Sequence, residues 1–423
     1  MSRVHVVGAG LAGLGAALTL AGRGLEIVVH EAAPQAGGRC RSFAEAALGC
    51  RIDNGNHLVL AGNHAVRRYL ERSGASDGLI GPAAVLFPFV DLTSGARWTL
   101  RWDRGRVPWW LLSPSRRVPG TRLRTYLQTI RLVRAGPDAT IGDVLDVGDP
   151  LFRQLLDPLA RAILNTPPAL ASAALLGAVF KETFGRGAAA TRPLVARHGL
   201  SETFVDPARE ALARAGASLR LGRRLRALDC AGARCVRLVF SDGEEELGPG
   251  DRVVLAVPAA QAAALLPGLT VPEQHHAIVN GHFRVDRPIT LPDGAILLGI
   301  LGGTAEWIFV RDRVASVTVS AADGLADLAG SEIAERLWAD VVRAFGLPPS
   351  PLPPCRIVKE KRATFSQTPS EVKRRPSART GLANLVLAGD WTDTGLPATI
   401  EGALRSGERA ADLILNEAST ISR

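Results

Sequence analysis

The sequence is poor in cysteine, methionine and tyrosine, with five Cys, one Met and two Tyr among 423 residues. The cysteines are odd in number and scattered along the chain, which excludes a disulfide-rich secreted scaffold. Cys230 and Cys235 lie close together, but no second pair of ligands is near them, so the pattern predicts no metal site. We therefore expect reduced thiols and a cytoplasmic protein.

A long, uninterrupted apolar run is also missing. The longest uncharged stretches, 162–180 and 253–272, are interrupted by prolines, which excludes a membrane-spanning helix. A cleavable signal peptide is not expected, because the first predicted strand already begins at residue 4. With 47% hydrophobic and 22% charged residues, the composition is that of a globular protein, and the length allows two domains.

Acidic residues are absent from residues 104–134, where eight arginines accumulate. This segment carries +8 of the net charge of +9, so the positive charge is a local patch and we expect no nucleic-acid partner. Trp109 and Trp110 accompany the arginines, together with an apolar stripe at helical spacing: Leu123, Leu127, Ile130 and Val133. The combination predicts peripheral contact with an anionic membrane, on the inner face of the cytoplasmic membrane. The alternative is a solvated helix whose apolar face packs on its own domain.

A nucleotide-binding pattern opens the chain. Residues 4–7 form a short apolar strand, which Gly8, Gly10 and Gly13 follow at the start of an Ala- and Leu-rich helix. A second strand, 26–30, ends in Glu31, where a carboxylate can bind the hydroxyls of a ribose. The glycines permit a tight turn, close approach of a pyrophosphate and packing of the helix on the strand. Together these features predict a dinucleotide site rather than a glycine-rich turn that binds nothing.

The residues after Glu31 favour a flavin over a nicotinamide cofactor. The run Gly37-Gly38-Arg39-Cys40-Arg41-Ser42 resembles the second motif of the glutathione-reductase-type FAD proteins, specifically the amine oxidase and carotenoid desaturase superfamily. In that superfamily the glycines and the arginine run along the FAD pyrophosphate and ribityl chain. The resemblance therefore implies that Arg39 contacts phosphate, with Arg41 behind it; a surface arginine is the alternative for each.

The same resemblance implies an α/β fold with a discontinuous, Rossmann-like FAD-binding domain of the glutathione reductase type. We expect this domain to comprise residues 1–74, 195–267 and 380–423. Residues 75–194 and 268–379 are expected to form a mixed α+β substrate domain that faces the membrane. The first of these insertions looks mostly helical, with one helix over 169–180. The second contains strand-like runs and a helix over 331–345 that begins with a Ser331 cap.

Four further elements narrow the resemblance to the squalene-associated, FAD-dependent family of hopanoid biosynthesis, the hydroxysqualene dehydroxylases. They are Asp-Asn-Gly-Asn-His at 53–57, Leu-Asn-Thr-Pro-Pro at 164–168, Arg-Ala-Thr-Phe-Ser-Gln-Thr-Pro at 362–369, and the closing segment 387–403. The similarity covers nearly the whole chain and is most specific in the closing segment. Two features depart from the pattern: Asn56, where glutamine is expected, and an unusually polar region after Gly185.

Family membership implies a non-covalent FAD site, because no cysteine or histidine lies where a covalent flavin bond forms. Asp390 would bind the ribityl or pyrophosphate end, the backbone at Leu225 would contact the adenine, and a helix that begins near Thr399 would stabilise the anionic reduced flavin. The implied cofactor-binding residues are Gly8, Gly10, Leu11, Ala12, Gly13, Glu31, Gly38, Arg39, Gly55, Asn56, Leu225, Gly389, Asp390, Ala398, Thr399 and Ile400.

The implied reaction is reductive removal of the hydroxyl of hydroxysqualene, an apolar isoprenoid, to give squalene. Protonation of an allylic hydroxyl, loss of water and hydride transfer require an acid, a dry apolar cavity and a reduced flavin. His57 is the first candidate for the acid and Asp53 the second; the alternative is that both only brace the loop beside the flavin. Because one dinucleotide fingerprint is present, we expect an external electron donor.

Three other functions stay open. The nearest is a desaturase that removes hydride from a polyisoprenoid such as phytoene or squalene. A flavin amine oxidase is disfavoured, because Leu396 and Thr399 stand where the amine oxidases carry an aromatic pair against the flavin. An isoprenoid-lipid-binding escort protein without flavin is the non-enzymatic alternative, which the intact Glu31, Arg39 and Asp390 oppose.

Overall fold

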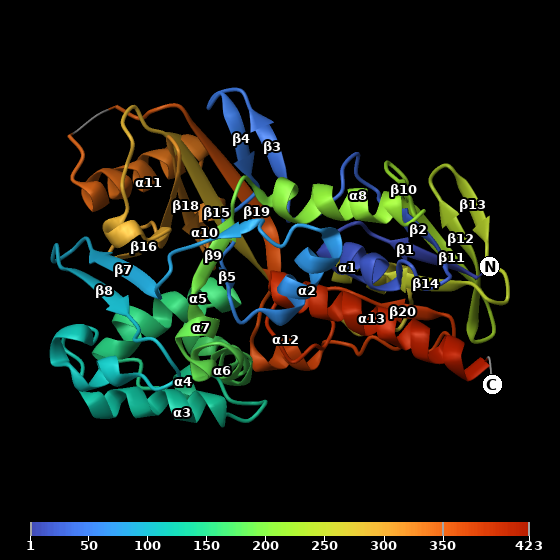
Figure 1. Cartoon of the computed structure of the whole chain (residues 1–423), viewed down its shortest axis with the longest axis horizontal. Helices are drawn as coiled ribbons and strands as arrows, with labels where there is room; N and C mark the ends of the chain where they lie inside the picture. Colours follow the sequence, from blue (N-terminus) through green and yellow to red (C-terminus); the bar gives the residue numbers. More distant parts are fainter. Residues whose placement is uncertain (1, 349–350, 422–423) are drawn as a thin grey trace.

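Two large β-sheets lie side by side in the computed structural model, which describes residues 2–348 and 351–421. A parallel sheet occupies the right half of Figure 1 and a mixed sheet the left half, and the two chain ends are near each other at the right. Both halves draw on segments that are far apart in the sequence. The site is therefore built from non-contiguous parts of the chain.

The parallel sheet has five short strands whose side chains are mostly buried apolar residues. In spatial order they are β10 (Ser218–Arg220), β2 (Glu26–His30), β1 (Arg3–Val7), β14 (Arg252–Leu255) and β20 (Leu385–Leu387). A parallel sheet is buried on both faces, which is why these strands are continuous apolar runs rather than alternating ones. The central β1 has its sequence neighbour β2 on one side and the distant β14 on the other, as in a doubly wound nucleotide fold. This confirms the predicted α/β, Rossmann-like class.

Helices cover one face of the parallel sheet, and a small antiparallel sheet covers the other. The helices are α1 (Leu11–Leu20), α2 (His64–Ser73), α8 (Asp206–Arg214) and α13 (Ile400–Ile421). The small sheet consists of β11 (Leu225–Ala231), β12 (Arg234–Phe240) and β13 (Gly243–Glu246), with α9 (Ala259–Leu265) beside it.

The helices α1 and α13 cross in close contact. At Gly407 of α13, an added Cβ would lie 2.2 Å from the carbonyl oxygen of Ala12 in α1, so only glycine fits. The end of the chain therefore packs directly on its beginning.

The mixed sheet has seven strands and forms the wall of the second half. In spatial order they are β19 (Cys355–Phe365), β15 (His275–Arg284), β18 (Val314–Val319), β17 (Trp307–Arg311), β16 (Leu297–Leu301), β7 (Leu86–Asp91) and β8 (Arg97–Arg101). One face packs on α11 (Gly330–Phe345) through Ile333, Leu337 and Trp338. The opposite face contributes Phe87, Leu297 and Trp307 to a core with α5 (Asp157–Leu164) and α6 (Ala173–Glu182).

Smaller elements connect these layers. They are the strands β3 (Ser42–Glu45), β4 (Cys50–Asp53), β5 (Val59–Leu60), β6 (Leu79–Ile80) and β9 (Pro193–Ala196), and the helices α3 (Gln128–Val133), α4 (Ile141–Val144), α7 (Ala188–Thr191), α10 (Asp323–Ala326) and α12 (Pro369–Lys373). The β4 strand leads directly into the loop that carries Asn54 to His57.

The insertions differ from expectation in three details. Most of the regular structure in the segment 75–194 is helical, as expected, but the segment also supplies β7 and β8 to the mixed sheet, and β7 pairs in parallel with β16, more than two hundred residues later. Such a long-range partner leaves no local signal in the sequence. Ser331 does not cap α11, which begins at Gly330 after Ala329, without a side-chain cap. The helix predicted over 169–180 begins instead at Ala173, where the Ser172 hydroxyl accepts the amide hydrogen of Leu175.

Candidate active site

A cavity of about 1060 Å³ runs from the carboxyl ends of the parallel strands to the mixed sheet. It begins where the order of strands around β1 switches direction, which is where ligands bind in open α/β sheets. Nearly all residues predicted to bind the cofactor line it: Gly8, Gly10, Leu11, Ala12, Glu31, Gly38, Arg39, Gly55, Asn56, Leu225, Gly389, Asp390, Ala398, Thr399 and Ile400. Gly13 and Asp53 are not among the lining residues.

The glycines after β1 have two different tasks. At Gly8, where φ is +110°, an added Cβ would lie 2.4 Å from the carbonyl oxygen of Ala256, and at Gly13 it would lie 1.9 Å from the carbonyl oxygen of Gly8. These two positions allow the loop and the helix to pack closely. At Gly10 an added Cβ would meet nothing within 4 Å. Since Gly10 lines the cavity, this space is open for a phosphate group at the amino end of α1.

Glu31 lies at the carboxyl end of β2 and braces the same loop. Its Oε2 accepts the amide hydrogen of Ala9 at 2.7 Å, and its Oε1 accepts that of Ala33 at 2.8 Å. Each carboxylate oxygen can accept a further bond, because a carboxylate offers about four acceptor positions. Glu31 can thus hold the glycine loop and still bind a pair of ribose hydroxyls.

Arg39 joins the N-terminal motif to the closing segment. Its Nη2 donates to Oδ2 of Asp390 at 2.6 Å, and its Nη1 donates to the carbonyl oxygen of Ala363 at the end of β19. The adjacent Asp390 carboxylate raises the pKa of Arg39, so the guanidinium stays charged. A fixed cation at the edge of the cavity suits the phosphates of a dinucleotide.

Gln367 ties three separated sequence elements together behind the cavity. Its side-chain Nε2 donates to the carbonyl oxygen of Leu164, and its backbone amide donates to the Thr166 hydroxyl. Its Oε1 accepts the amide hydrogen of Ala398, two residues before α13 begins. The fully buried Gln367 therefore fixes the entry to α13, whose first turn lines the cavity.

Arg375 also positions the closing segment, and the sequence gives no signal for it. It is buried, and its guanidinium donates to the carbonyl oxygens of Leu396, Asp390 and Thr392. Burial lowers its pKa to about 10, so it remains charged at neutral pH. In the sequence it follows Lys373 and Arg374 and resembles part of a solvated basic run.

The far half of the cavity is apolar. Its lining includes Phe87, Leu159, Ile163, Leu297, Trp307 and Phe309, from β7, α5, β16 and β17. Leu396 and Thr399 line the cavity in the closing segment. The space fits a long hydrocarbon better than a charged amine, since a buried ammonium needs a partner.

The two candidate acids lie in different surroundings. His57 lines the cavity, and burial lowers its pKa to about 4, so its imidazole is neutral at pH 7. Asp53 instead accepts hydrogen bonds from the Ser42 hydroxyl at 2.6 Å and the Leu200 amide at 2.8 Å, and pairs with Arg311 at 3.2 Å. These contacts hold Asp53 away from the cavity lining and favour a bracing role over proton donation for this residue.

Glu306, immediately before β17, is a half-buried carboxyl that sequence reasoning missed. Burial raises its pKa to about 7. Its Oε2 accepts the amide hydrogen of Ser320 at 2.8 Å, and its Oε1 lies 3.3 Å from Nε of Arg161. Its neighbours Trp307 and Ser320 both line the cavity, so Glu306 stands directly behind the apolar wall.

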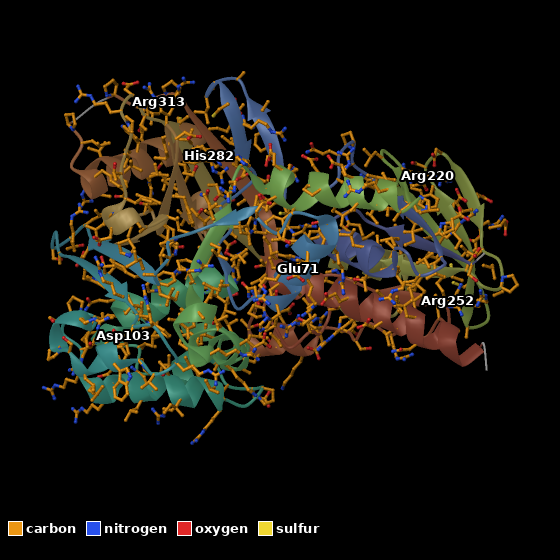
Figure 2. All side chains as sticks on the ribbon, viewed as in Figure 1. Glu71, Asp103, Arg220, Arg252, His282 and Arg313 are labelled. Carbon is orange, nitrogen blue, oxygen red and sulfur yellow. The ribbon has the colours of Figure 1, made fainter. Side chains whose placement is uncertain are left out.

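The arginine-rich segment 104–134 forms an outer edge of the second half. Among the residues that the structure describes, seven of the thirteen exposed large apolar side chains fall within it, including Trp109, Leu112 and Leu127, each about 60% exposed. The stripe of Leu123, Leu127, Ile130 and Val133 is exposed, while Trp110, Tyr126 and Leu132 pack inward. The α3 helix of this segment runs along the lower left edge of Figure 1. Asp103, labelled in Figure 2, lies in the same region and pairs with Arg116 at 2.6 Å.

The segment also touches the wall of the cavity. Trp102, just before it, stacks obliquely on Phe184 with ring centres 5.8 Å apart, and Phe184 lines the cavity. The amide of Ala188 donates to the carbonyl oxygen of Gly105 at 3.0 Å. In the described part of the chain, no helix combines the length and the apolar character that crossing a bilayer requires.

Comparison with known proteins identifies close relatives over the full length. The family model described as "Flavin containing amine oxidoreductase" matches residues 11–415. The chain is 48% identical to the hydroxysqualene dehydroxylase of Sinorhizobium fredii over 417 residues, which cover 99% of each protein. It is 48% identical to that of Rhodopseudomonas palustris over 97% of this chain and 98% of the relative, and 40% identical to that of Zymomonas mobilis over 98% and 100%.

Solved structures share the fold at low sequence identity. An oxidoreductase from Methanosarcina mazei superposes with a TM-score of 0.74 at 15% identity, covering 97% of this chain and all of the other. Cyclohexylamine oxidase from Brevibacterium oxydans gives a TM-score of 0.71 at 16% identity over 99% of each chain. At such identities these similarities establish the architecture alone.

Proposed function

Because the chain belongs to the flavin-containing amine oxidoreductase family, and within it to the hydroxysqualene dehydroxylases, we propose that it converts hydroxysqualene to squalene with FAD as its cofactor. The observation that carries the proposal is the 48% identity to two hydroxysqualene dehydroxylases over nearly the whole of both chains. The apolar far half of the cavity supports it, since a squalene derivative is almost entirely hydrocarbon.

The cofactor is FAD, and the residues around the near half of the cavity fit it. Gly10 leaves room for the pyrophosphate, Glu31 can accept bonds from a ribose, and Arg39 supplies a fixed cation. The first turn of α13 lines the cavity, so the positive end of its dipole lies beside the place that a flavin ring would occupy. When bound and reduced, the flavin supplies a hydride. We propose that it is bound non-covalently.

The proposed reaction removes a hydroxyl and adds a hydrogen. One proton and one hydride are consumed, the carbon–oxygen bond breaks, and water leaves. The chain must therefore donate a proton at the substrate oxygen and exclude bulk water from the resulting allylic cation. His57 is the proposed proton donor because its imidazole faces the cavity, whereas Asp53 is committed to the Ser42 and Leu200 contacts. The side chains of Phe87, Leu297 and Trp307 keep the far half dry.

We also propose that the segment 104–134 rests on the inner face of the cytoplasmic membrane. It combines eight arginines with exposed Trp109, Leu112 and Leu127, which suits an anionic lipid surface. Trp102, just before the segment, packs against the cavity-lining Phe184, and Gly105 accepts the Ala188 amide hydrogen, so the proposed membrane-facing edge is near the cavity that would receive the isoprenoid. Electrons are proposed to come from an external donor, because the sequence has a single dinucleotide fingerprint.

The direct test is product analysis. Purified protein with chemically reduced FAD, incubated without oxygen with hydroxysqualene, should yield squalene. Phytoene and squalene under oxidising conditions test the desaturase alternative. Absence of squalene in the first assay, with a conjugated polyene in the second, would refute the dehydroxylase. A colourless protein that takes up no FAD would instead favour a lipid escort.

A further inference from the structure

Three polar side chains form a hydrogen-bonded chain on the wall of the cavity. Nδ2 of Asn56 donates to the Thr318 hydroxyl at 2.9 Å, and that hydroxyl donates to Oδ1 of Asn280 at 2.8 Å. Nδ2 of Asn280 reaches the carbonyl oxygen of Asn54 at 3.4 Å. Asn56, Asn280 and Thr318 all line the cavity, so this polar chain faces the bound molecules rather than the core.

The position of the polar chain is fixed by two independent pairings. Asn280 in β15 and Thr318 in β18 lie directly opposite each other in the antiparallel ladder, and both are buried. The loop that carries Asn56 packs directly on β15, because an added Cβ at Gly55 would lie 3.0 Å from Nδ2 of Asn280. The Asn56 amide is therefore held between the cofactor-side loop and the mixed sheet.

The hydrogen-bonding capacity of this polar chain is only partly used. The Thr318 hydrogen goes to Asn280, and one of its lone pairs accepts from Asn56. One of the two amide hydrogens of Asn56 is used, and no group among the described residues bonds to the other or to Oδ1. The Asn56 amide thus presents one free donor and one free acceptor on a residue that lines the cavity.

Within an isoprenoid alcohol, only the hydroxyl group can pair with the free donor and the free acceptor of the Asn56 amide. On the same cavity, Phe87, Leu297, Trp307 and Phe309 offer only apolar contact, apart from the indole nitrogen. A hydroxyl group donates one hydrogen bond and accepts others, which matches the free N–H and the free oxygen of Asn56. A hydrocarbon would leave both unpaired, and unpaired polar groups in a dry site oppose binding.

We propose that Asn56, held in place by Thr318 and Asn280, binds the hydroxyl of the substrate and distinguishes the alcohol from the hydrocarbon product. The proposal rests on the proposed function, which makes the alcohol the substrate. Asn56 contacts the hydroxyl, while Thr318 and Asn280 are positioning residues. Loss of the hydroxyl during the reaction removes the partner of the Asn56 amide, so the product is bound more weakly than the substrate and leaves.

The test measures binding rather than turnover. The oxidised FAD holoenzyme is titrated with hydroxysqualene and with squalene, and the dissociation constants follow from the change in flavin absorbance. We expect the wild type to prefer the alcohol by ~10-fold or more, because a site built to bind a hydroxyl rejects the analogue that lacks it. Asn56→Leu and Thr318→Val should weaken binding of the alcohol ~10-fold and leave the affinity for squalene unchanged. If both variants keep the wild-type preference, or shift both ligands in parallel, the proposal is wrong.

Thr364→Val is the matched control. Thr364 also lines the cavity, but its hydroxyl accepts from Asn165 in a separate contact, so this variant should retain the alcohol preference. Because Asn56 is also among the residues predicted to bind the cofactor, the FAD content of each variant is measured first, and both variants are titrated at full FAD occupancy; Asn56→Leu and Thr318→Val can then be compared, and either alone carries the test if the other does not retain FAD. Product analysis with the wild type separates the two levels. If the wild type produces squalene but Asn56→Leu keeps the full binding preference for the alcohol over squalene, this inference alone is wrong. If the wild type produces no squalene, the proposed function is wrong.

Discussion

Arg39 and Asp390 are 351 positions apart in the sequence, yet Nη2 of the arginine and Oδ2 of the aspartate are 2.6 Å apart. The pair joins the glycine-rich N-terminal half of the cofactor site to the closing segment that leads into α13. Both residues line the cavity, so the ion pair is part of the site and not only a brace behind it.

Replacing Arg39 should weaken FAD binding. Arg39→Ala removes a cation from the pyrophosphate side and leaves the Asp390 carboxylate without its partner. A hydrogen bond to a charged group contributes about 1.5–3 kcal/mol, so the FAD dissociation constant should rise ~10- to 100-fold. Fluorescence titration of the deflavinated protein with FAD measures it. Arg41→Ala is the comparison, because half-buried Arg41 also lines the cavity but, in the described part of the chain, donates to the carbonyl oxygen of Gly38 rather than to Asp390. An equal increase in the FAD dissociation constant of both variants would show that Arg39 has no special role in binding FAD.

The pH dependence of the rate should identify the proton donor. Since burial lowers the pKa of His57 to about 4, about one molecule in a thousand carries the protonated imidazole at pH 7. If His57 donates the proton, kcat/KM rises ~10-fold for each unit by which the pH falls from 7 toward 5. His57→Gln should abolish this slope, and His275→Gln, which also alters the lining, should keep it. A rate that is constant over this range, or that changes only near pH 7, excludes His57 as the donor.

Glu306 should make stability depend on pH. Burial raises its pKa from 4.5 to about 7, so the fold favours the protonated carboxyl. That stabilisation is complete below pH 4.5 and is lost as the pH rises through 7, for a total of about 3 kcal/mol. Glu306→Gln mimics the protonated form and can still accept the Ser320 amide hydrogen. Its free energy of unfolding relative to wild type should therefore increase between pH 5 and pH 8 in denaturant titrations. Glu332→Gln, at an exposed pair with Arg336, should show no such trend.

Membrane association should depend on both the charge and the apolar side chains of the segment 104–134. Replacing Arg122, Arg124, Arg131 and Arg134 with glutamine should reduce sedimentation with anionic liposomes and weaken its salt dependence, because lysine and arginine near an anionic surface each contribute about 1 kcal/mol. Trp109→Ala with Leu127→Ala should reduce binding at high salt, when charge is screened. Arg209→Gln with Arg214→Gln, on α8, provides a charge control. Unchanged sedimentation of the arginine variant would refute the membrane proposal.

The sequence predicts the cofactor half of the site well because its signals are local. Each of its features can be recognised from a few neighbouring residues: the glycines after β1, Glu31 at the end of β2, and the Gly37-Gly38-Arg39 turn. The apolar half is different. Its walls come from strands such as β7 and β16, which pair over more than two hundred residues, so neither partner reveals the other.

The polar residues behind the site were missed for a related reason. Arg375 follows two other basic residues and is indistinguishable in sequence from a solvated charge, although it is buried and holds the Leu396 and Asp390 carbonyls. Gln367 belongs to a motif that carries the family resemblance, but its three contacts form only after the chain has folded. Glu306 has no motif at all, and its raised pKa results only from burial.

The packing of α13 on α1 has a consequence for synthesis of the protein. A ribosome synthesises β20, Asp390 and α13 after the other parts of the cofactor site, so the site cannot be completed before they emerge. Until then β14 has an open edge, and α1 lacks the helix that Gly407 brings within contact of Ala12. Exposed strand edges in incomplete chains invite pairing with other chains. A nascent chain, or a chain truncated before β20, should therefore be colourless and prone to aggregation, and flavin should be acquired only after α13 has been synthesised.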